Sequence, residues 1–414
     1  MSLFYNMRIG TKITIASTFV VLLSMVVLAF VIISHSSEIL RKESNTLLYN
    51  SAKRSANLIQ GYINESYAVL NAAQANTEDY IEFTNGQEIK EEILDDLVTN
   101  MVDKNSYGIY GYLYLKNTVV SPKLNLNGAT LLMAYDNNPG GDGGVSVIKP
   151  DAQIISFRGF QDTLNSGKPS VGDARHINID GKNTYVVAIN LPIRDKKSQQ
   201  IIGVIGMFLD FDALTRDIVE SKRLSVFPND YRMVVDRNAR IIAHHNDSLE
   251  GQLLTDINRH KSAVDLAQAI KLHKDGEIIK YSNYRGQVSY GAVAIFNIWH
   301  DIDDFMGLII VAPEDSILAP AHELRNYIIL IVVMSILLIS SLLFVIVKMS
   351  VIPPIQTIQN LLFSFFKYLN HETKKPPVLV PVNSHDELGN MAEAINANIE
   401  KTQKSLEQDS HAVS

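Results

Sequence analysis

The side chains of this sequence that could take part in chemistry are few, and their types favour binding over catalysis. The 414-residue chain contains no cysteine, which excludes thiolate nucleophiles and cysteine-ligated metal sites. His244 and His245 are adjacent and could suggest a metal site, but at the end of an expected strand we interpret them as turn residues. Tyr112 and Tyr114 are two residues apart in another expected strand, so they share one face and either line a pocket or pack in the core. We therefore expect no enzymatic activity, no cofactor and no metal.

Two segments of the chain are long and apolar enough to cross a membrane. Residues 13–33 and 327–347 are uncharged runs, and a helix of about 20 residues spans the roughly 30 Å hydrocarbon core of a bilayer. The first run is longer than the apolar region of a secretory signal, and no A-x-A cleavage site follows it. We therefore expect an uncleaved transmembrane helix here rather than a cleaved signal. Two spans are too few to form a transport pathway.

The charges that flank these runs predict the orientation of the chain. Arg8 and Lys12 precede the first run, and Lys348 follows the second. Because basic residues are retained on the cytoplasmic side, both termini, including residues 1–12, are expected in the cytoplasm. Residues 34–326 then lie outside the inner membrane, in the periplasm of a Gram-negative cell. The net charge of −7, from 37 Lys and Arg against 44 Asp and Glu, argues against nucleic-acid binding.

The external segment begins with a pattern that predicts one long helix over residues 34–75. Ile59, Ile63, Tyr67 and Leu70 recur at helical spacing, and no proline interrupts the pattern. A helical stalk of this kind commonly pairs with its own copy. We therefore expect a homodimer.

Short apolar or alternating runs, separated by turn residues, predict strands from residue 107 onward. They form two sets, which predict two α+β modules with antiparallel sheets: a membrane-distal module over about 76–225 and a membrane-proximal module over about 226–315. Residues 249–272 are expected to form a helical connection within the second. The predicted strands are residues 108–115, 183–193, 200–209, 231–236, 239–245, 276–284, 288–296 and 305–313.

Residues 348–405, after the second apolar run, predict two helices joined by a connector. Apolar residues from Ile355 to Leu369 repeat at alternating spacings of three and four, which is a heptad seam typical of a coiled coil. A connector containing prolines follows, and Asp386-Glu387-Leu388-Gly389 opens a second seam. Residues 406–414 form a tail.

Several of these segments resemble a known receptor family. DYRMVVDRNARIIAHHNDSLEGQLLTDI resembles the start of the membrane-proximal module of a double-Cache sensor, and LPIRDKKSQQIIGVIGMFLDFDAL resembles the closing hairpin of its distal module. The helices around the connector, with Pro354, Asp386, Glu387 and Gly389, resemble a HAMP domain. This layout is similar to that of methyl-accepting chemotaxis proteins, especially the transducer-like chemoreceptors of Campylobacter and Helicobacter. The resemblance implies an α+β, PAS-like double-Cache sensor on a long helix, two transmembrane helices and a C-terminal HAMP coiled coil.

The resemblance also implies where a ligand would bind. Receptors of this family that bind amino acids carry R-x-W-Y, P-Y-x-D and an Asp after G-V-V-G-x in the distal module. The corresponding residues here are Arg158, Phe160 and Gln161 for the first motif, Arg175 and His176 for the second, and Phe208 in place of the Asp; Tyr112 and Tyr114 are further candidates.

The departures from the family motifs all disfavour a ligand with an ammonium group. The arginine that would bind a carboxylate is kept, while the acidic residues that would bind an ammonium are lost. A buried ammonium without an anionic partner is costly, whereas an arginine can hold a carboxylate through two hydrogen bonds. We therefore expect a small carboxylate ligand such as formate, lactate or pyruvate. Two alternatives stay open: an amino acid, or no direct ligand and recognition of a periplasmic binding protein.

The expected output of the chain is signalling to another protein. The sequence contains no signalling hairpin, no histidine-kinase H-box and no GGDEF motif. We expect a separate cytoplasmic partner, a chemoreceptor signalling subunit coupled to CheA and CheW, to supply the output of a split or truncated receptor. The alternatives are the sensor half of a histidine kinase or diguanylate cyclase, and a binding or adhesion protein with a HAMP-like stalk.

Overall fold

The computed structural model describes residues 7–84, 87–299, 302–370, 372–373, 375–382 and 386–413. The chain divides into two compact units. One unit, Ile39–Ala319, contains both sheets, and the other combines Met1–Glu38 with Pro320–Ser414. The α+β fold class predicted from the sequence is confirmed.

The first helix is longer than the sequence predicts. Helix α2 runs without a break from Ile9 to Thr84, so it joins the first apolar run to the stalk and continues beyond residue 75. Within the sheet-bearing unit, the buried side chains of α2 recur every three or four residues, as a helix with one packed face requires. They are Leu48, Ala52, Ala56, Ile59, Ile63, Tyr67, Leu70 and Ala73.

The distal module is built on an eight-stranded antiparallel sheet. Its order is β2-β3-β1-β8-β7-β5, with β4 on β3 and β6 on β7. The sequence correctly predicts the long strands β1, β7 and β8 but misses the other five. The bounds are β1 Gly108–Leu115, β2 Asn125–Leu126, β3 Ala129–Asp136, β4 Val145–Ile148, β5 Ser170–Val171, β6 Arg175–Ile179, β7 Lys182–Arg194 and β8 Ile201–Asp210.

Helices cover both faces of the distal sheet. Helix α3 (Glu91–Asp103) and α2 lie on one face, and a side chain at Gly111 of β1 would collide with Val102 and Met101 of α3. Helix α4 (Arg158–Ser166), preceded by the short helix η2 (Ile154–Ser156), lies on the other face. Helix α5 (Phe211–Ile218) leads out of the sheet.

The proximal module has a five-stranded antiparallel sheet in the order β10-β9-β13-β12-β11. Helix α2 covers one face, and the helices α6 and α7, which the sequence predicts as one helical connection, cover the other. The bounds are β9 Tyr231–Asp236, β10 Ile241–His244, α6 Leu254–Ile257, α7 Lys261–Lys271, β11 Ile278–Ser282, β12 Val288–Trp299 and β13 Ile302–Pro313.

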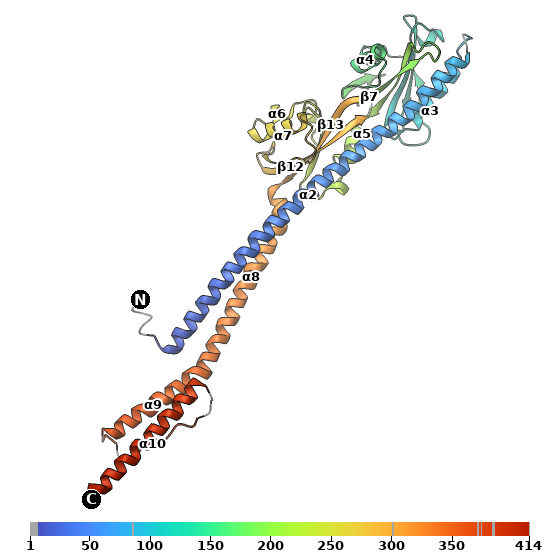
Figure 1. Ribbon diagram of the computed structural model, residues 1–414. Helices are drawn as coiled ribbons and strands as arrows, with labels where there is room; N and C mark the ends of the chain where they lie inside the picture. The colour runs from blue at the N-terminus through green and yellow to red at the C-terminus, as the bar shows by residue number, and fades with distance from the viewer. Residues whose placement is uncertain are drawn as a thin grey trace. The chain divides into compact units, whose positions relative to one another are not determined.

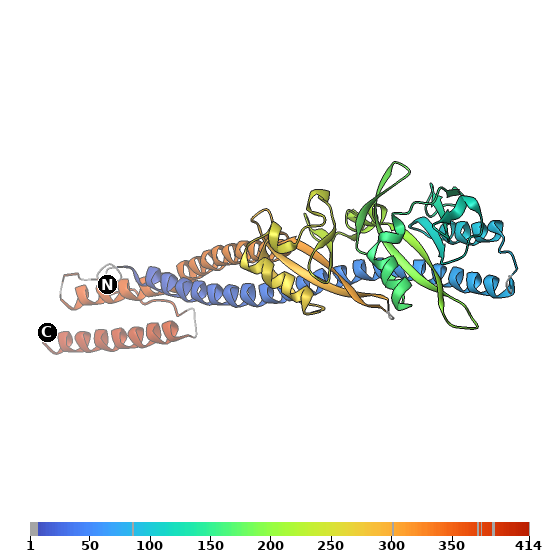
Figure 2. The same ribbon diagram turned by 90° about the horizontal axis from the view of Figure 1, so that it is seen from above.

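One hydrophobic core joins α2 to both sheets. Leu48 and Ile59 of α2 belong to the same buried cluster as Leu113 of β1 and Leu308 of β13. Figures 1 and 2 both show α2 running alongside the two sheets. Burying each large aliphatic side chain contributes about 1.5–3 kcal/mol, so the seam of α2 is the main attachment that the two modules share.

The second unit is helical. Helix α8 (Glu314–Ile346), the π-helix η5 (Val347–Val351) and α9 (Ile352–Leu369) follow one another, and α10 (Glu387–Val413) begins after the connector. By length and composition, α2 and the path from α8 to α9 are apolar enough to cross a membrane, and no part of their most apolar stretches is buried. This agrees with the two predicted spans.

The connector between α9 and α10 is held by specific hydrogen bonds. The amide of Asn396 donates to the carbonyl of Val380 at 2.7 Å and accepts from its N–H at 3.2 Å. The carboxylate of Asp386 accepts the N–H groups of Leu388 and Gly389 at the start of α10, which is the role of a helix cap. The HAMP assignment itself stays a prediction.

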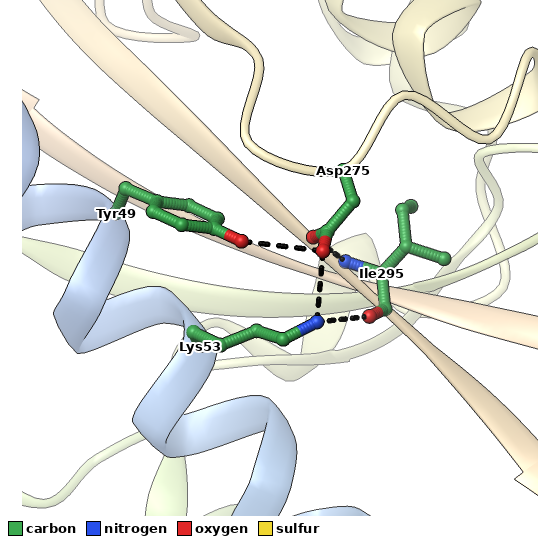
Figure 3. Close-up of polar contacts among 4 residues, drawn as sticks. All are labelled: Tyr49, Lys53, Asp275 and Ile295. Carbon is green, nitrogen blue, oxygen red and sulfur yellow. Dashed lines mark hydrogen bonds and ion pairs between the residues drawn. The ribbon is translucent and has the colours of Figure 1, made fainter.

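A polar cluster reinforces the packing of α2 against the proximal module (Figure 3). Lys53 of α2 lies 2.9 Å from the carboxylate of Asp275 and donates to the carbonyl of Ile295 at 3.0 Å. Asp275 also accepts from the Tyr49 hydroxyl and from the N–H of Ile295. Burial opposes ionisation of Asp275, but the hydrogen bonds from Lys53 and Ile295 outweigh it and hold the pKa of this carboxyl below its usual value.

Replacing Asp275 with Asn should therefore lower the free energy of unfolding by about 1 kcal/mol at neutral pH, because the charged contacts are partly exposed. A lowered carboxyl pKa stabilises the fold above the ordinary pKa near 3.9, and this contribution is lost as the pH falls below it. The difference between wild type and variant, followed by thermal unfolding of the full chain in detergent, should shrink from pH 7 to pH 3. Asp265→Asn, at an exposed site on α7, is the matched control, and a difference that stays constant with pH would contradict the assignment.

Candidate functional site

A small cavity lies in the distal module, on the face of the sheet opposite α2. Its walls come from β1, β7 and β8 below and from η2, α4 and the segment around β5 and β6 above. The volume is about 10 Å³, which is room for about one water molecule. The lining residues are Tyr112, Phe157, Gly159, Phe160, Gly172, Asp173, Arg175, Val186, Ala188, Asn190 and Phe208.

The inner end of the cavity is polar but uncharged. The hydroxyl of the buried Tyr112 donates to the side-chain oxygen of Asn190, and the Asn190 amide donates to the Ser170 hydroxyl at 3.2 Å. Ser170 in turn donates to the carbonyl of Gly159 at 2.6 Å. Burial raises the pKa of Tyr112, so its hydroxyl stays neutral. This chain of groups can exchange hydrogen bonds with a ligand but supplies no charge to it.

Aromatic rings form the walls. The ring of Phe208 lies 5.3 Å from that of Tyr112 and 6.0 Å from that of Phe157, measured between centroids. Phe160 is buried against Tyr112 and Tyr114. Phe208 occupies the position where the amino-acid-binding motif places an acidic residue, so this wall offers an ammonium no partner.

Arg175 is the cationic residue of the cavity. Its side chain is 35% exposed, and its guanidinium lies 4.8 Å from the centre of the Phe157 ring, a cation–π contact that fixes its position. Its acidic partner is Asp173, which also lines the cavity, but the closest charged atoms are 3.8 Å apart and the Asp173 side chain is 76% exposed. Such an exposed pair contributes little, about 0–1 kcal/mol, so Arg175 can readily change partner.

The structure places Arg158 away from this cavity. Arg158 is the first residue of α4, whose buried side is formed by Gly159, Phe160 and Thr163. Its side chain is 76% exposed and lies 3.5 Å from Asp162, one turn later. The expected contact between Arg158 and a carboxylate in this cavity therefore finds no support in the geometry.

Three other predicted residues also lie outside the cavity lining. His176 is the neighbour of Arg175 in β6, so it points to the opposite, exposed face and packs on Tyr185. The Gln161 amide donates to the carbonyl of Ile155 at 2.6 Å, and Tyr114 packs against Phe160. Of the predicted set, the cavity thus brings together Tyr112, Phe160, Arg175 and Phe208.

Sequence reasoning missed two polar residues of the cavity. Asp173 lies in the loop between β5 and β6, where no sequence pattern indicated a ligand contact. Asn190 could have been found from the sequence, because it is an isolated amide within the apolar run of the predicted strand 183–193. In the structure it is completely buried. A buried amide needs a hydrogen-bonding partner, which Tyr112 supplies.

A second, larger cleft lies between the two modules. It has a volume of about 560 Å³ and is lined by charged residues from both. The distal module contributes Arg158, Asp162 and Asp173, and the proximal module contributes Asp236, Arg237, Arg240 and Asp304. Asp173 is the charged residue that lines both the small cavity and this cleft.

Comparison with known proteins identifies the architecture. A family model described as a Cache domain matches residues 36–321. The fold is similar to the periplasmic sensory domain of the Campylobacter jejuni chemoreceptor Tlp1, with 23% identity, a TM-score of 0.60 and coverage of 68% of this chain and 99% of that one. It is also similar to a protein named methyl-accepting chemotaxis protein X (13% identity, TM-score 0.52, 65% and 98% coverage). Among proteins with curated functions, none matches.

A third similar structure is the extracellular domain of mmHK1S-Z3, named for a histidine kinase. It has 15% identity and a TM-score of 0.51, with coverage of 69% of this chain and 99% of that one. At these identities the likeness shows a shared fold. The same sensor architecture thus occurs in proteins named for two different kinds of output.

A substitution at Gly206 should disturb the inner end of the cavity. Gly206 of β8 pairs with Tyr112 of β1, and a Cβ atom there would overlap the Tyr112 ring. Gly206→Ala should destabilise the sensor by about 1–3 kcal/mol, as overpacking of a buried site does. The measurement is thermal unfolding of the full chain.

Gly61→Ala in α2 is the matched control, because no atom lies within 4 Å of the added Cβ. It should leave stability unchanged or raise it by up to about 1 kcal/mol. Equal effects of the two substitutions would show that the Tyr112 ring is not fixed against β8.

Proposed function

The chain belongs to the Cache domain family, and on that premise we propose that it is a transmembrane chemoreceptor sensor whose distal module binds a small carboxylate. The observation that carries the proposal is the position of Arg175, a half-buried guanidinium at an aromatic cavity whose inner end is uncharged. Its only charged partner among the described residues is the exposed Asp173. A ligand carboxylate would exchange this loose contact for hydrogen bonds to a positioned guanidinium, worth about 1.5–3 kcal/mol each.

The inner end of the cavity limits what the rest of the ligand can be. Tyr112 and Asn190 can hydrogen-bond a hydroxyl or carbonyl group, and Phe208 and Phe160 favour a short apolar part. Lactate, pyruvate and formate fit this chemistry. Because the cavity is small, a ligand must displace side chains to enter. At about 1.5 kcal/mol per heavy atom at most, a three-atom acid would bind with a dissociation constant near 1 mM.

One observation favours an amino acid as a second candidate. Asp173 places a carboxylate beside Arg175 at the cavity mouth, so a zwitterion could lie with its carboxylate on Arg175 and its ammonium on Asp173. Against this, Asp173 is mostly exposed, so water screens its attraction for an ammonium.

The cleft between the modules suggests how binding is transmitted. Burial raises the pKa of Asp304, and the nearby carboxylates of Asp236 and Asp173 add to that effect, while the Arg237 guanidinium, 3.9 Å away, partly offsets it. A ligand that takes over Arg175 leaves Asp173 without its cation while it faces these carboxylates. The resulting repulsion favours a different spacing of the modules, which is a two-state response driven by differential binding.

For the output, we propose that the helices α2 and α8 carry the change to the HAMP-like pair α9 and α10. A separate chemoreceptor signalling subunit, coupled to CheA and CheW at the inner membrane, would read it. The sensor half of a histidine kinase or cyclase is the competing assignment, and identification of the cytoplasmic partner decides between them.

The ligand class can be tested with lactate and alanine, which differ mainly in a hydroxyl against an ammonium. Lactate should bind the full chain in nanodiscs, and Arg175→Gln should weaken it at least 10-fold, since the loss of one charged hydrogen bond has that size. Asp173→Asn should strengthen lactate binding by removing the competing carboxylate. Calorimetric titration measures both effects.

Arg158→Gln is the matched control, because it removes a guanidinium from the same module without touching the cavity, and lactate affinity should not change. Weaker lactate binding in Arg158→Gln than in Arg175→Gln would restore the motif-based assignment. Alanine binding that depends on Asp173, with no lactate binding, would establish the amino-acid alternative.

The proposed homodimer can be tested because the chain contains no cysteine. Leu47 and Leu58 are exposed apolar residues on one side of α2, as a pairing surface requires. Leu58→Cys should form a disulfide-linked dimer on mild oxidation in membranes, resolved by non-reducing electrophoresis. Asp265→Cys on α7 is the control and should remain monomeric; equal crosslinking of both would contradict pairing through α2.

A further inference from the structure

The proximal module contains a second cavity in a place equivalent to the first. It lies between the sheet and α6, on the face opposite α2, as the distal cavity lies beneath α4. Its volume is also about 10 Å³. We propose that this cavity is a binding site for a small uncharged molecule with a carbonyl or hydroxyl oxygen, distinct from the proposed carboxylate site.

His244 supplies a hydrogen-bond donor of defined direction. Its side chain lies in the lining of the cavity, and the residue is 1% exposed. The Nδ1 atom accepts the N–H of Asn246 at 2.9 Å, which leaves the hydrogen of the neutral ring on Nε2. No acceptor among the described residues takes this Nε2 hydrogen. Burial, together with the neighbouring His245, lowers the pKa of His244 to about 3, so the ring remains neutral at physiological pH.

Two tyrosines supply the second donor. The hydroxyl oxygens of Tyr231 and Tyr281 lie 3.3 Å apart at the cavity. One hydroxyl donates to the other, so the hydrogen of the second is left for another acceptor. Burial raises the pKa of both tyrosines, and both remain neutral donors.

The lining excludes a charged ligand. Among the described residues of the cavity wall there is no Asp, Glu, Lys or Arg. Besides His244 and the two tyrosines, the wall is formed by Met233, Ile241, Leu249, Leu254, Ile257, Asn258 and Tyr284. Glu250 lies just outside, where its carboxylate accepts the backbone N–H of His244 at 3.3 Å. Within the wall a ligand carboxylate would meet no cation, because Arg285 lies at the mouth, and an ammonium would meet no carboxylate. An uncharged acceptor satisfies the His244 and tyrosine donors without either cost.

The mouth of the cavity carries a polar contact that a ligand could displace. The Tyr284 hydroxyl lies 3.3 Å from Nε2 of His245 and accepts from the Arg285 guanidinium at 2.9 Å. Both Tyr284 and His245 are partly exposed. A ligand would enter here by displacing these two side chains, neither of which belongs to a named strand or helix.

The test uses acetamide and acetate, which have nearly the same shape and differ in charge. Saturation-transfer NMR on the full chain in nanodiscs should detect acetamide with the wild type. His244→Phe, which keeps a ring but removes the donor, and Tyr281→Phe, which removes one hydroxyl, should each weaken the acetamide signal several-fold. Arg175→Gln should leave acetamide unchanged.

Thermal unfolding shows whether each variant is folded, and if His244→Phe is not, Tyr281→Phe decides. No acetamide signal with the wild type, or the same signal with folded Tyr281→Phe and His244→Phe, would overturn the proximal site. Acetate provides the separate readout of the distal site: its signal should fall in Arg175→Gln and persist in Tyr281→Phe. If the acetate signal does not fall in Arg175→Gln while the acetamide results are as expected, the proposed distal carboxylate site is wrong and the proximal site is still supported.

Discussion

The sensor depends on one packing constraint: two sheets bury a face against the same helix. The seam from Leu48 to Ala73 of α2 belongs to one core with strands of both modules, and the cluster of Lys53 and Asp275 adds directional contacts to it. Separating either sheet from α2 would expose a large apolar area, which costs about 25 cal/mol per Å². Rearrangements of low cost are therefore confined to the opposite faces, where α4, α6 and α7 lie.

Both cavities lie on those opposite faces, and their electrostatics differ. The distal cavity has its charges at the mouth, where Arg175 and Asp173 are still partly solvated, and neutral groups within. A charge at the mouth avoids the desolvation cost of a buried ion and still attracts a carboxylate. The proximal cavity has neutral donors within and no charge in its wall. The proposed difference in ligand class follows from where each module places its charges.

Much of this arrangement could be predicted from the sequence, and the exceptions have physical causes. Nearly continuous apolar runs located β1, β7 and β8, because both faces of these strands are buried. Helical spacing located α2, because it packs along one face. The strands β3 and β6 were missed although the apolar run of β3 and the alternation of β6 are present in the sequence. Arg158 was assigned to the site by its place in a motif, but its position on α4 places its side chain on the exposed side of that helix. In β6, neighbouring side chains point to opposite faces, so Arg175 faces the cavity and His176 does not.

A shared helix has a consequence for two ligands acting on one chain. If each ligand changes how its module packs on α2, the free energy of binding at one site depends on occupancy of the other, and this coupling is reciprocal. The cleft between the modules adds a second connection, because Asp173 lines both the distal cavity and the cleft that contains Asp304. A carboxylate at Arg175 changes the charge balance of the cleft, whereas an uncharged proximal ligand does not. On these proposals, the distal ligand would act on module spacing through charge, and the proximal ligand would act through packing alone.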